Sequence, residues 1–304
     1  MAILRPFDIA PVLNALSTIR LGNYKTYFNT VDDYDLYGCY QWNGEVSRSF
    51  LPVIHLLEVT LRNAYHRELS RYHSLAVQGI SADSFEWYNH VRLSDHSKKS
   101  IKNTLKTRTK PDDVISKQTF GFWTNILSES ITPWGTVLKD VVPNTQRNWA
   151  HRSNRDWLEA RKLLINDLRN RIAHWEPVWK LPDLMEERII RPGAAALKVV
   201  SPAPTNPEQS IARLRMYHAR IVAVLDLVDS KLSGSYLDSY TNEHFMWVCS
   251  EAGLASFRAC ERRKEVSPSI GRRDLLRFMR GKAMVTVVNG KNRMRLYPLG
   301  ARFG

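Results

Sequence analysis

Apolar residues recur three and four positions apart along much of this chain, which is the pattern of helices that bury one face. The clearest stripe has three members at i, i+3 and i+7: Ile165, Leu168 and Ile172. Pro177 disfavours helical geometry at the residue before it, so this helix is expected to end near His174 or Trp175. Similar stripes predict helices over residues 8–27, 49–72, 207–232 and 245–257. The pattern therefore predicts a mainly α fold.

Particular residues mark the ends and the packing of these helices. Ser49 can cap its helix and Pro52 suits the first turn, whereas Gly234 is expected to end the last long helix. His218 lies on the apolar stripe of that helix, where we expect a core or interface histidine. Aromatic residues are concentrated in 31–44 and again in 119–127. Both groups are expected to pack in the core, although a stacking platform for bases is an alternative for the first.

The last part of the chain has a different character. Residues 285–292 alternate in the manner of strands around Asn289-Gly290, which predicts a β-hairpin with a two-residue turn. From Arg258 to Arg302 there are thirteen Lys or Arg and three Asp or Glu, so 13 − 3 = +10 of the formal charge lies there. We therefore expect a helical bundle over residues 1–235 and a basic C-terminal extension over residues 236–304. The extension either docks RNA or an antidote, or is a loosely ordered appendage.

Charge and composition narrow the classes of function. A formal net charge of +14 and a pI near 9.8 favour a polyanionic partner, with RNA or DNA as the first candidate. No apolar run approaches the roughly 18 residues of a membrane span, so no membrane partner is expected. Three cysteines without metal-ligand spacing, and no signal-peptide pattern, fit a cytoplasmic protein. Clustered carboxylates and Gly-rich phosphate loops are missing from the sequence, so neither a metal nor a cofactor is expected.

Candidate chemistry gathers at the end of the helix that carries the clearest stripe. Asn170 and His174 are four residues apart and share a face, and Arg169 has a side chain long enough to reach both. Imidazole exchanges protons near neutral pH, and guanidinium is a fixed positive charge that suits a phosphorane-like transition state. These residue types suit a ribonuclease that uses the 2′-hydroxyl as its nucleophile, and the alternative is a surface arginine with a helix-capping histidine. The pattern Arg-Asn-x-x-x-His at the end of a bundle helix resembles the signature of HEPN-domain ribonucleases, which implies that Arg169, Asn170 and His174 are the catalytic residues.

Four segments of the chain, taken together, resemble the Abi-like (abortive infection) proteins, a branch of the HEPN ribonuclease superfamily. They are LYGCYQWN at 36–43, LLEVTLRN at 56–63, TFGFW at 119–123 and LRNRIAH at 168–174. The resemblance covers roughly residues 13 to 230 and implies a HEPN-type helical bundle acting as a metal-independent endoribonuclease toxin in bacterial phage defence. It also implies a homodimer in which two histidine-bearing helix ends face each other. An antitoxin protein or an inhibitory RNA would be a further partner.

The resemblance also gives a supporting role to one segment of the 49–72 helix. Glu58, Arg62 and Asn63 would orient the residues of the later motif from across the bundle, whereas the alternative is an ordinary surface ion pair between Glu58 and Arg62. Arg62 to His66 echoes the later motif with a spacing one residue short. The alternative function is a non-catalytic HEPN module that binds nucleic acid or a protein partner. A His174 that lies at a symmetric dimer groove open to solvent would favour the enzyme, and a His174 buried against Trp175 would oppose it.

Overall fold

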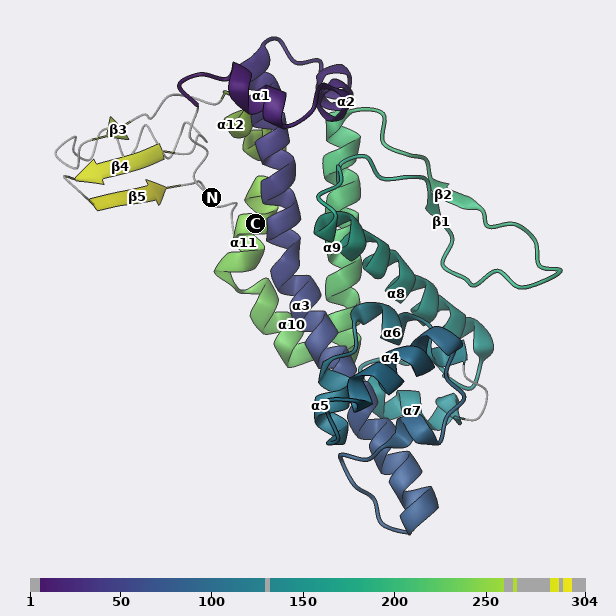
Figure 1. Ribbon diagram of the computed structural model, residues 1–304. Coiled ribbons are helices and arrows are strands. Elements are labelled where there is room, and N and C mark those ends of the chain that lie inside the picture. The colour runs from purple at the N-terminus through teal and green to yellow at the C-terminus, as the bar shows by residue number, and fades with distance from the viewer. Residues whose placement is uncertain (1–5, 129–131, 260–264, 267–284, 290–291, 297–304) are drawn as a thin grey trace.

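The computed structural model describes residues 6–128 and 132–259, together with the backbone of residues 265–266, 285–289 and 292–296. It confirms a mainly helical fold, in which one long helix, α3, runs through the molecule and other helices pack around it (Figure 1). No helix among the described residues combines the length and the apolar character that crossing a membrane requires.

Helix α3 spans Asp33–Gln78 and is much longer than the predicted helix over 49–72. It begins where the Asp32 side chain accepts a hydrogen bond from the Asp35 amide at 2.8 Å, and it ends at Gly79, whose φ is 74°. The aromatic residues expected to pack lie in its first turns, where Tyr40 and Trp42 are buried. Packing in the core is therefore confirmed for Tyr40 and Trp42, whereas Tyr34 and Tyr37 are half-buried. The helix that carries them is continuous with the predicted one.

Pro52 lies inside α3, so the prediction that it occupies a first helical turn is wrong. A proline in a helix interior leaves the carbonyl four residues earlier without its amide partner. Here that carbonyl belongs to Arg48, and both Pro52 and Arg48 are exposed, so water can satisfy it. Buried side chains on the opposite face, including Phe50 and Val53, hold the helix together across this point.

Two short helices replace the single helix predicted over residues 8–27. They are α1 (Ala10–Ala15) and α2 (Thr18–Phe28), and they lie at one end of α3 (Figure 1). The break falls at Ser17, whose φ of 73° is incompatible with a continuous right-handed helix.

Helix α9 (Pro207–Val228) packs beside α3, and α10 (Ser230–Leu237) follows it after a break at Asp229. The expectation that Gly234 ends the helix is wrong, because Asp229 turns the chain and its side chain accepts from the Leu232 amide at 2.9 Å. His218 is buried on α9 and its Nε2 lies 2.8 Å from the Tyr236 hydroxyl, which confirms a satisfied core histidine.

The predicted helix over 245–257 is also two helices, α11 (Tyr240–Val248) and α12 (Glu251–Ala259). Both pack on α3, and α12 does so most closely: a Cβ at Gly38 would collide with the Phe257 carbonyl. The Arg258 guanidinium also binds the Asp35 carboxylate through two hydrogen bonds of 2.7 and 2.8 Å. The boundary expected at residue 235 falls inside α10, and the helical bundle continues to Ala259.

Short helices surround the other end of α3. They are η1 (Trp87–Asn89), α4 (Asp95–Leu105), α5 (Pro111–Ser116), α6 (Phe120–Thr124), η2 (Ile126–Ser128) and α7 (Trp134–Val141). The chain then forms α8 (Arg152–Ala173), which packs on α6 through the aromatic segment predicted to wall it. Phe120, Phe122 and Trp123 are buried there.

Two small sheets complete the described structure. β1 (Leu184–Met185) pairs antiparallel with β2 (Val199–Ser201) across the long connection between α8 and α9. β4 (Val285–Asn289) pairs antiparallel with β5 (Asn292–Leu296), with Asn289 opposite Asn292, which confirms the predicted hairpin pairing. The turn residues and most of the basic segment from 258 to 302 lie outside the described residues. β3 (Glu265–Val266) adds a parallel strand that the sequence did not indicate.

Candidate functional site

The predicted end of α8 is confirmed, and it has a well-defined hydrogen-bond pattern. The helix stops at Ala173, with His174 as its C-terminal cap. The Glu176 amide bonds the Arg171 carbonyl at 2.9 Å, and the Trp175 amide bonds the Ile172 carbonyl at 3.1 Å. These two bonds are those of a Schellman motif, in which the residue after the cap adopts a left-handed conformation.

Trp175 occupies that left-handed position with a φ of 55°, where glycine is the usual residue. The indole is held in place despite the strained backbone. Its Nε1 donates to the Tyr40 hydroxyl at 2.9 Å, and a Cβ at Gly44 would approach ring atom Cζ2 to 3.2 Å. Asn43 fixes the following loop by accepting from the Val178 amide at 2.9 Å. The end of α8 is therefore attached to the first third of α3.

His174 is exposed, and its side chain makes no hydrogen bond or ion pair within the described residues. Its amide donates to the Asn170 carbonyl at 2.9 Å, so the two residues lie on the same side of the helix end. Arg169 is half-buried, and its Nη1 lies 3.5 Å from the Asn170 Oδ1. This is a long and weak hydrogen bond, so the guanidinium remains available to an anion.

The neighbouring arginine is used differently. Arg171 Nη1 donates to the Lys180 carbonyl at 2.8 Å, and its Nε lies 3.7 Å from a Glu176 carboxylate oxygen. These contacts tie Arg171 to the loop that follows the helix. Of the two arginines beside Asn170, Arg169 is therefore the one suited to binding a ligand.

The three residues with a predicted supporting role are not brought to this helix end. Arg62 donates to the Asn63 Oδ1 at 3.3 Å and to the Ser116 carbonyl at 3.4 Å. Arg62 and Asn63 lie 18 to 20 residues further along α3 than Asn43 and Gly44, where the end of α8 is attached. At the rise of an α-helix this is about 27–30 Å along the axis of α3. Glu58 is half-buried and forms no side-chain hydrogen bond or ion pair within the described part of the chain. No hydrogen bond or ion pair of the described residues joins these three side chains to Arg169, Asn170 or His174.

A buried lysine on α8 was not indicated by the sequence. Lys162 is fully buried, and its Nζ donates to the Trp123 carbonyl at 2.6 Å and to the Tyr65 hydroxyl at 3.3 Å. Burial lowers the pKa of Lys162, and the nearby Glu159 carboxyl counteracts part of that effect. These two hydrogen bonds connect Lys162 to α6 and to α3, so it contributes to the packing of α6 against α8.

Helix α4 presents a basic strip on its surface. Lys99, Lys102 and Lys106 are exposed and follow one another at i, i+3 and i+7, so they share one face of the helix. None of them forms an ion pair with another described residue. This strip is the part of the predicted basic run best suited to contact a polyanion.

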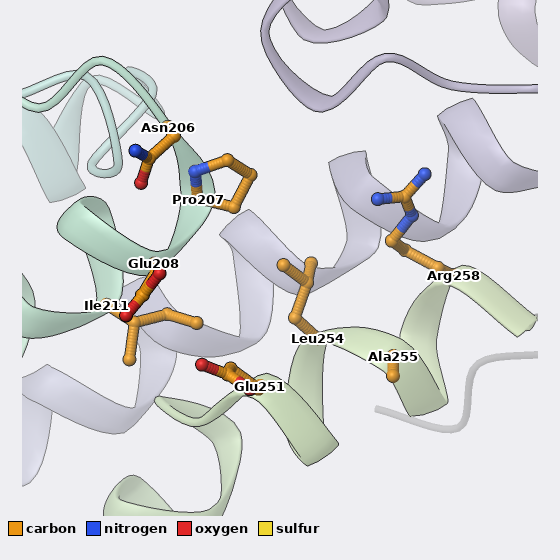
Figure 2. A pocket seen from close by; sticks show the side chains of 8 residues that line it. All are labelled: Asn206, Pro207, Glu208, Ile211, Glu251, Leu254, Ala255 and Arg258. Atoms are coloured by element: carbon orange, nitrogen blue, oxygen red, sulfur yellow. The ribbon is translucent and has the colours of Figure 1, made fainter.

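A groove of about 490 Å³ lies between the start of α9 and α12, and its lining includes the buried Ile211 and Leu254 and the exposed Glu208 and Glu251 (Figure 2). It contains none of the six residues singled out from the sequence. No group of three or more His, Cys, Asp or Glu side chains in the described ranges is arranged to hold a metal ion. The end of α8 therefore carries an exposed imidazole, His174, and a half-buried guanidinium, Arg169, which are the side chains predicted to transfer a proton and to bind an anion.

The sequence missed Trp175 and Tyr40 as parts of this site. Pro177, two residues after Trp175, does mark the end of the helix. A left-handed residue after a helix is usually glycine, so nothing in the sequence indicated that Trp175 adopts this conformation. Comparison of the chain with protein-family models, with curated proteins and with solved structures finds no match in any of the three.

Proposed function

We propose that this chain is a HEPN-type endoribonuclease that works without a metal and cleaves RNA at the end of α8. The observation that carries the proposal is the placement of His174: an exposed imidazole at a helix end, without a described side-chain partner. It lies on the same side of the helix end as Asn170, which the Arg169 guanidinium contacts. A proton-transferring group needs such access to its substrate. The formal charge of +14 supports a polyanionic substrate.

Each residue of the group has a role in this proposal. His174 accepts the proton of the 2′-hydroxyl as its oxygen bonds to phosphorus, or donates a proton to the 5′-oxygen as that oxygen leaves phosphorus. Arg169 holds the scissile phosphate and stabilises the negative charge that develops in the transition state. Asn170, which makes a long contact with Arg169, orients either Arg169 or His174 when RNA is bound. The substrate is single-stranded or loop RNA, because only a flexible strand brings its 2′-hydroxyl in line with the leaving oxygen.

The biological part of the proposal rests on the four-segment resemblance to Abi-like proteins. In that role the chain is a cytoplasmic toxin that restricts phage, acts as a homodimer and is restrained by an antitoxin protein or an inhibitory RNA. Expression in a bacterial host tests this part: the wild type inhibits growth, and His174→Ala relieves the inhibition at equal protein level. Equal toxicity of a folded His174→Ala protein would contradict it.

Cleavage of a labelled RNA hairpin with a single-stranded loop, in excess EDTA, tests the chemistry. His174→Ala and Arg169→Ala are each expected to reduce the rate at least about 100-fold, the lower bound for losing a general acid–base group and for losing one donor that stabilises the transition state. His151→Ala and Arg152→Ala are matched controls, since these exposed residues lie at the opposite end of the same helix. Products with 2′,3′-cyclic phosphate ends are expected. Full activity in folded His174→Ala, or activity that requires added Mg²⁺, would refute the mechanism.

A second candidate function is a non-catalytic module that binds nucleic acid. The observation that favours it is the basic strip of Lys99, Lys102 and Lys106, which contacts a polyanion without any chemistry. The same assay separates the two functions. A binding module retains RNA affinity in the wild type and in His174→Ala but produces no cleavage in either.

A further inference from the structure

We infer that Trp175 is a stacking platform that holds a nucleobase of the RNA next to His174. The inference rests on the proposed function, because it names how the same helix end grips its substrate. Trp175 is 47% exposed, an unusual degree for the largest aromatic side chain beside a site of polar groups. Indole faces stack on every base, so such a platform is tolerant of sequence.

The position of the ring is fixed by three separate features. The left-handed backbone at Trp175 sends the side chain away from the course of α8. The hydrogen bond to the Tyr40 hydroxyl orients the indole, and the close approach to Gly44 supports one edge of it. A ring held in this way loses little freedom when a base stacks on it, so the binding energy is not spent on ordering the side chain.

The strain at this position is a second reason to look for a ligand. A bulky residue at a positive φ is sparsely populated, and such residues cluster at ligand-binding positions. A glycine would complete the same Schellman motif without strain. The tryptophan is therefore better explained by what its ring contacts than by the needs of the helix end.

The surroundings favour a nucleotide over an apolar partner. In the sequence, Arg169 and His174 come before Trp175, and the exposed Lys180 comes after it. Lys180 belongs to the loop whose backbone Arg171 binds. A base on the indole would leave its phosphate among these cations, which is the combination used by proteins that bind single strands. An apolar protein partner would instead have to desolvate them.

The experiment measures binding of a fluorescein-labelled 12-nucleotide 2′-O-methyl oligouridine, which cannot be cleaved, by fluorescence anisotropy. Trp175→Leu keeps an apolar side chain but removes the π face, and it is expected to weaken binding about 5- to 150-fold, as for loss of one stacked base. Trp175→Phe restores most of the affinity. Tyr72→Leu, a half-exposed aromatic at the far end of α3, is the matched control and leaves binding unchanged.

A second probe with the same backbone but without bases separates stacking from charge. Its affinity is expected to be the same for wild type and Trp175→Leu. Equal affinity of both proteins for the oligouridine would overturn the inference, as would a Trp175→Leu variant that loses only self-association. If the wild type binds oligouridine through Trp175 but cleaves no RNA, the proposed function fails and the stacking site stands. If it cleaves RNA while Trp175→Leu binds normally, the stacking site fails alone.

Discussion

The left-handed conformation of Trp175 predicts that, at this position, a glycine variant is more stable than an alanine variant, which is the reverse of the usual order. At an ordinary helical position glycine is less stable than alanine by roughly 0.5–1 kcal/mol. At position 175 we expect the opposite order. Both variants keep the positive φ of 55°, which strains alanine but not glycine, because glycine has no Cβ. Strain of this kind costs about 1–2 kcal/mol for a residue with a Cβ. Trp175→Gly should therefore be more stable than Trp175→Ala by about 0.5–1 kcal/mol.

Both variants lose the ring, and the structure gives the size of that common loss. The indole is 47% exposed, so roughly 130 Å² of a tryptophan that can bury about 250 Å² is removed from water. At about 25 cal/mol per Å² this burial contributes roughly 3 kcal/mol. The hydrogen bond to Tyr40 adds about 1 kcal/mol. Trp175→Ala is thus expected to cost about 4 kcal/mol and Trp175→Gly about 3 kcal/mol.

Urea unfolding followed by far-UV circular dichroism measures these free energies when all variants are fitted with one m value. Ala173→Gly is the matched control, because Ala173 is an exposed helical residue two positions earlier. It should lower stability by about 1 kcal/mol relative to the wild type. A Trp175→Gly protein that is less stable than Trp175→Ala, as at position 173, would refute the assigned backbone conformation.

Three further predictions address packing, pH and assembly. Gly38→Ala should cost about 1–3 kcal/mol of unfolding free energy because its Cβ would collide with the Phe257 carbonyl, whereas Gly22→Ala, with no atom within 4 Å, should cost none. Burial lowers the pKa of Lys162, so wild-type stability should gain from this group as pH rises from that pKa to about 10.4, by up to about 1.4 kcal/mol per unit. Lys162→Met should lack this slope in urea unfolding across pH 7–10, and an identical pH profile would contradict the burial. If paired helix ends act together in a homodimer, adding His174→Ala chains to wild type should lower the cleavage rate beyond dilution. A fully active monomer in sedimentation would refute that pairing.

Much of the fold was accessible to sequence reasoning because it depends on local periodicity. The stripe from Ile165 to Ile172 and the proline at 177 are enough to place α8 and its end. The hairpin pairing around Asn289 follows from a turn signal that acts over a few residues. In each case the physical cause lies within the segment itself.

The errors have non-local causes. Pro52 sits inside α3 because buried side chains on the opposite face support the helix there. Lys162 is buried because the Trp123 carbonyl and the Tyr65 hydroxyl, both distant in sequence, receive its hydrogen bonds. Trp175 is left-handed although no glycine announces it, since Tyr40 and the small Gly44 accept its ring. None of these contacts produces a periodic pattern of apolar residues in the sequence.

The two arginine–asparagine segments show how surroundings separate residues that look alike in sequence. Arg62 donates to the Asn63 side chain and to the Ser116 carbonyl of α5. His66 is buried between the Asp112 carboxylate at 3.2 Å and the Trp87 indole at 2.9 Å. Burial lowers the pKa of His66, so its proton chemistry is shifted away from neutrality and closed to a substrate. His174 has the opposite setting, with an open imidazole at a helix end. The difference between the two histidines comes from the elements packed around each one, and it directs the search for catalysis to the end of α8.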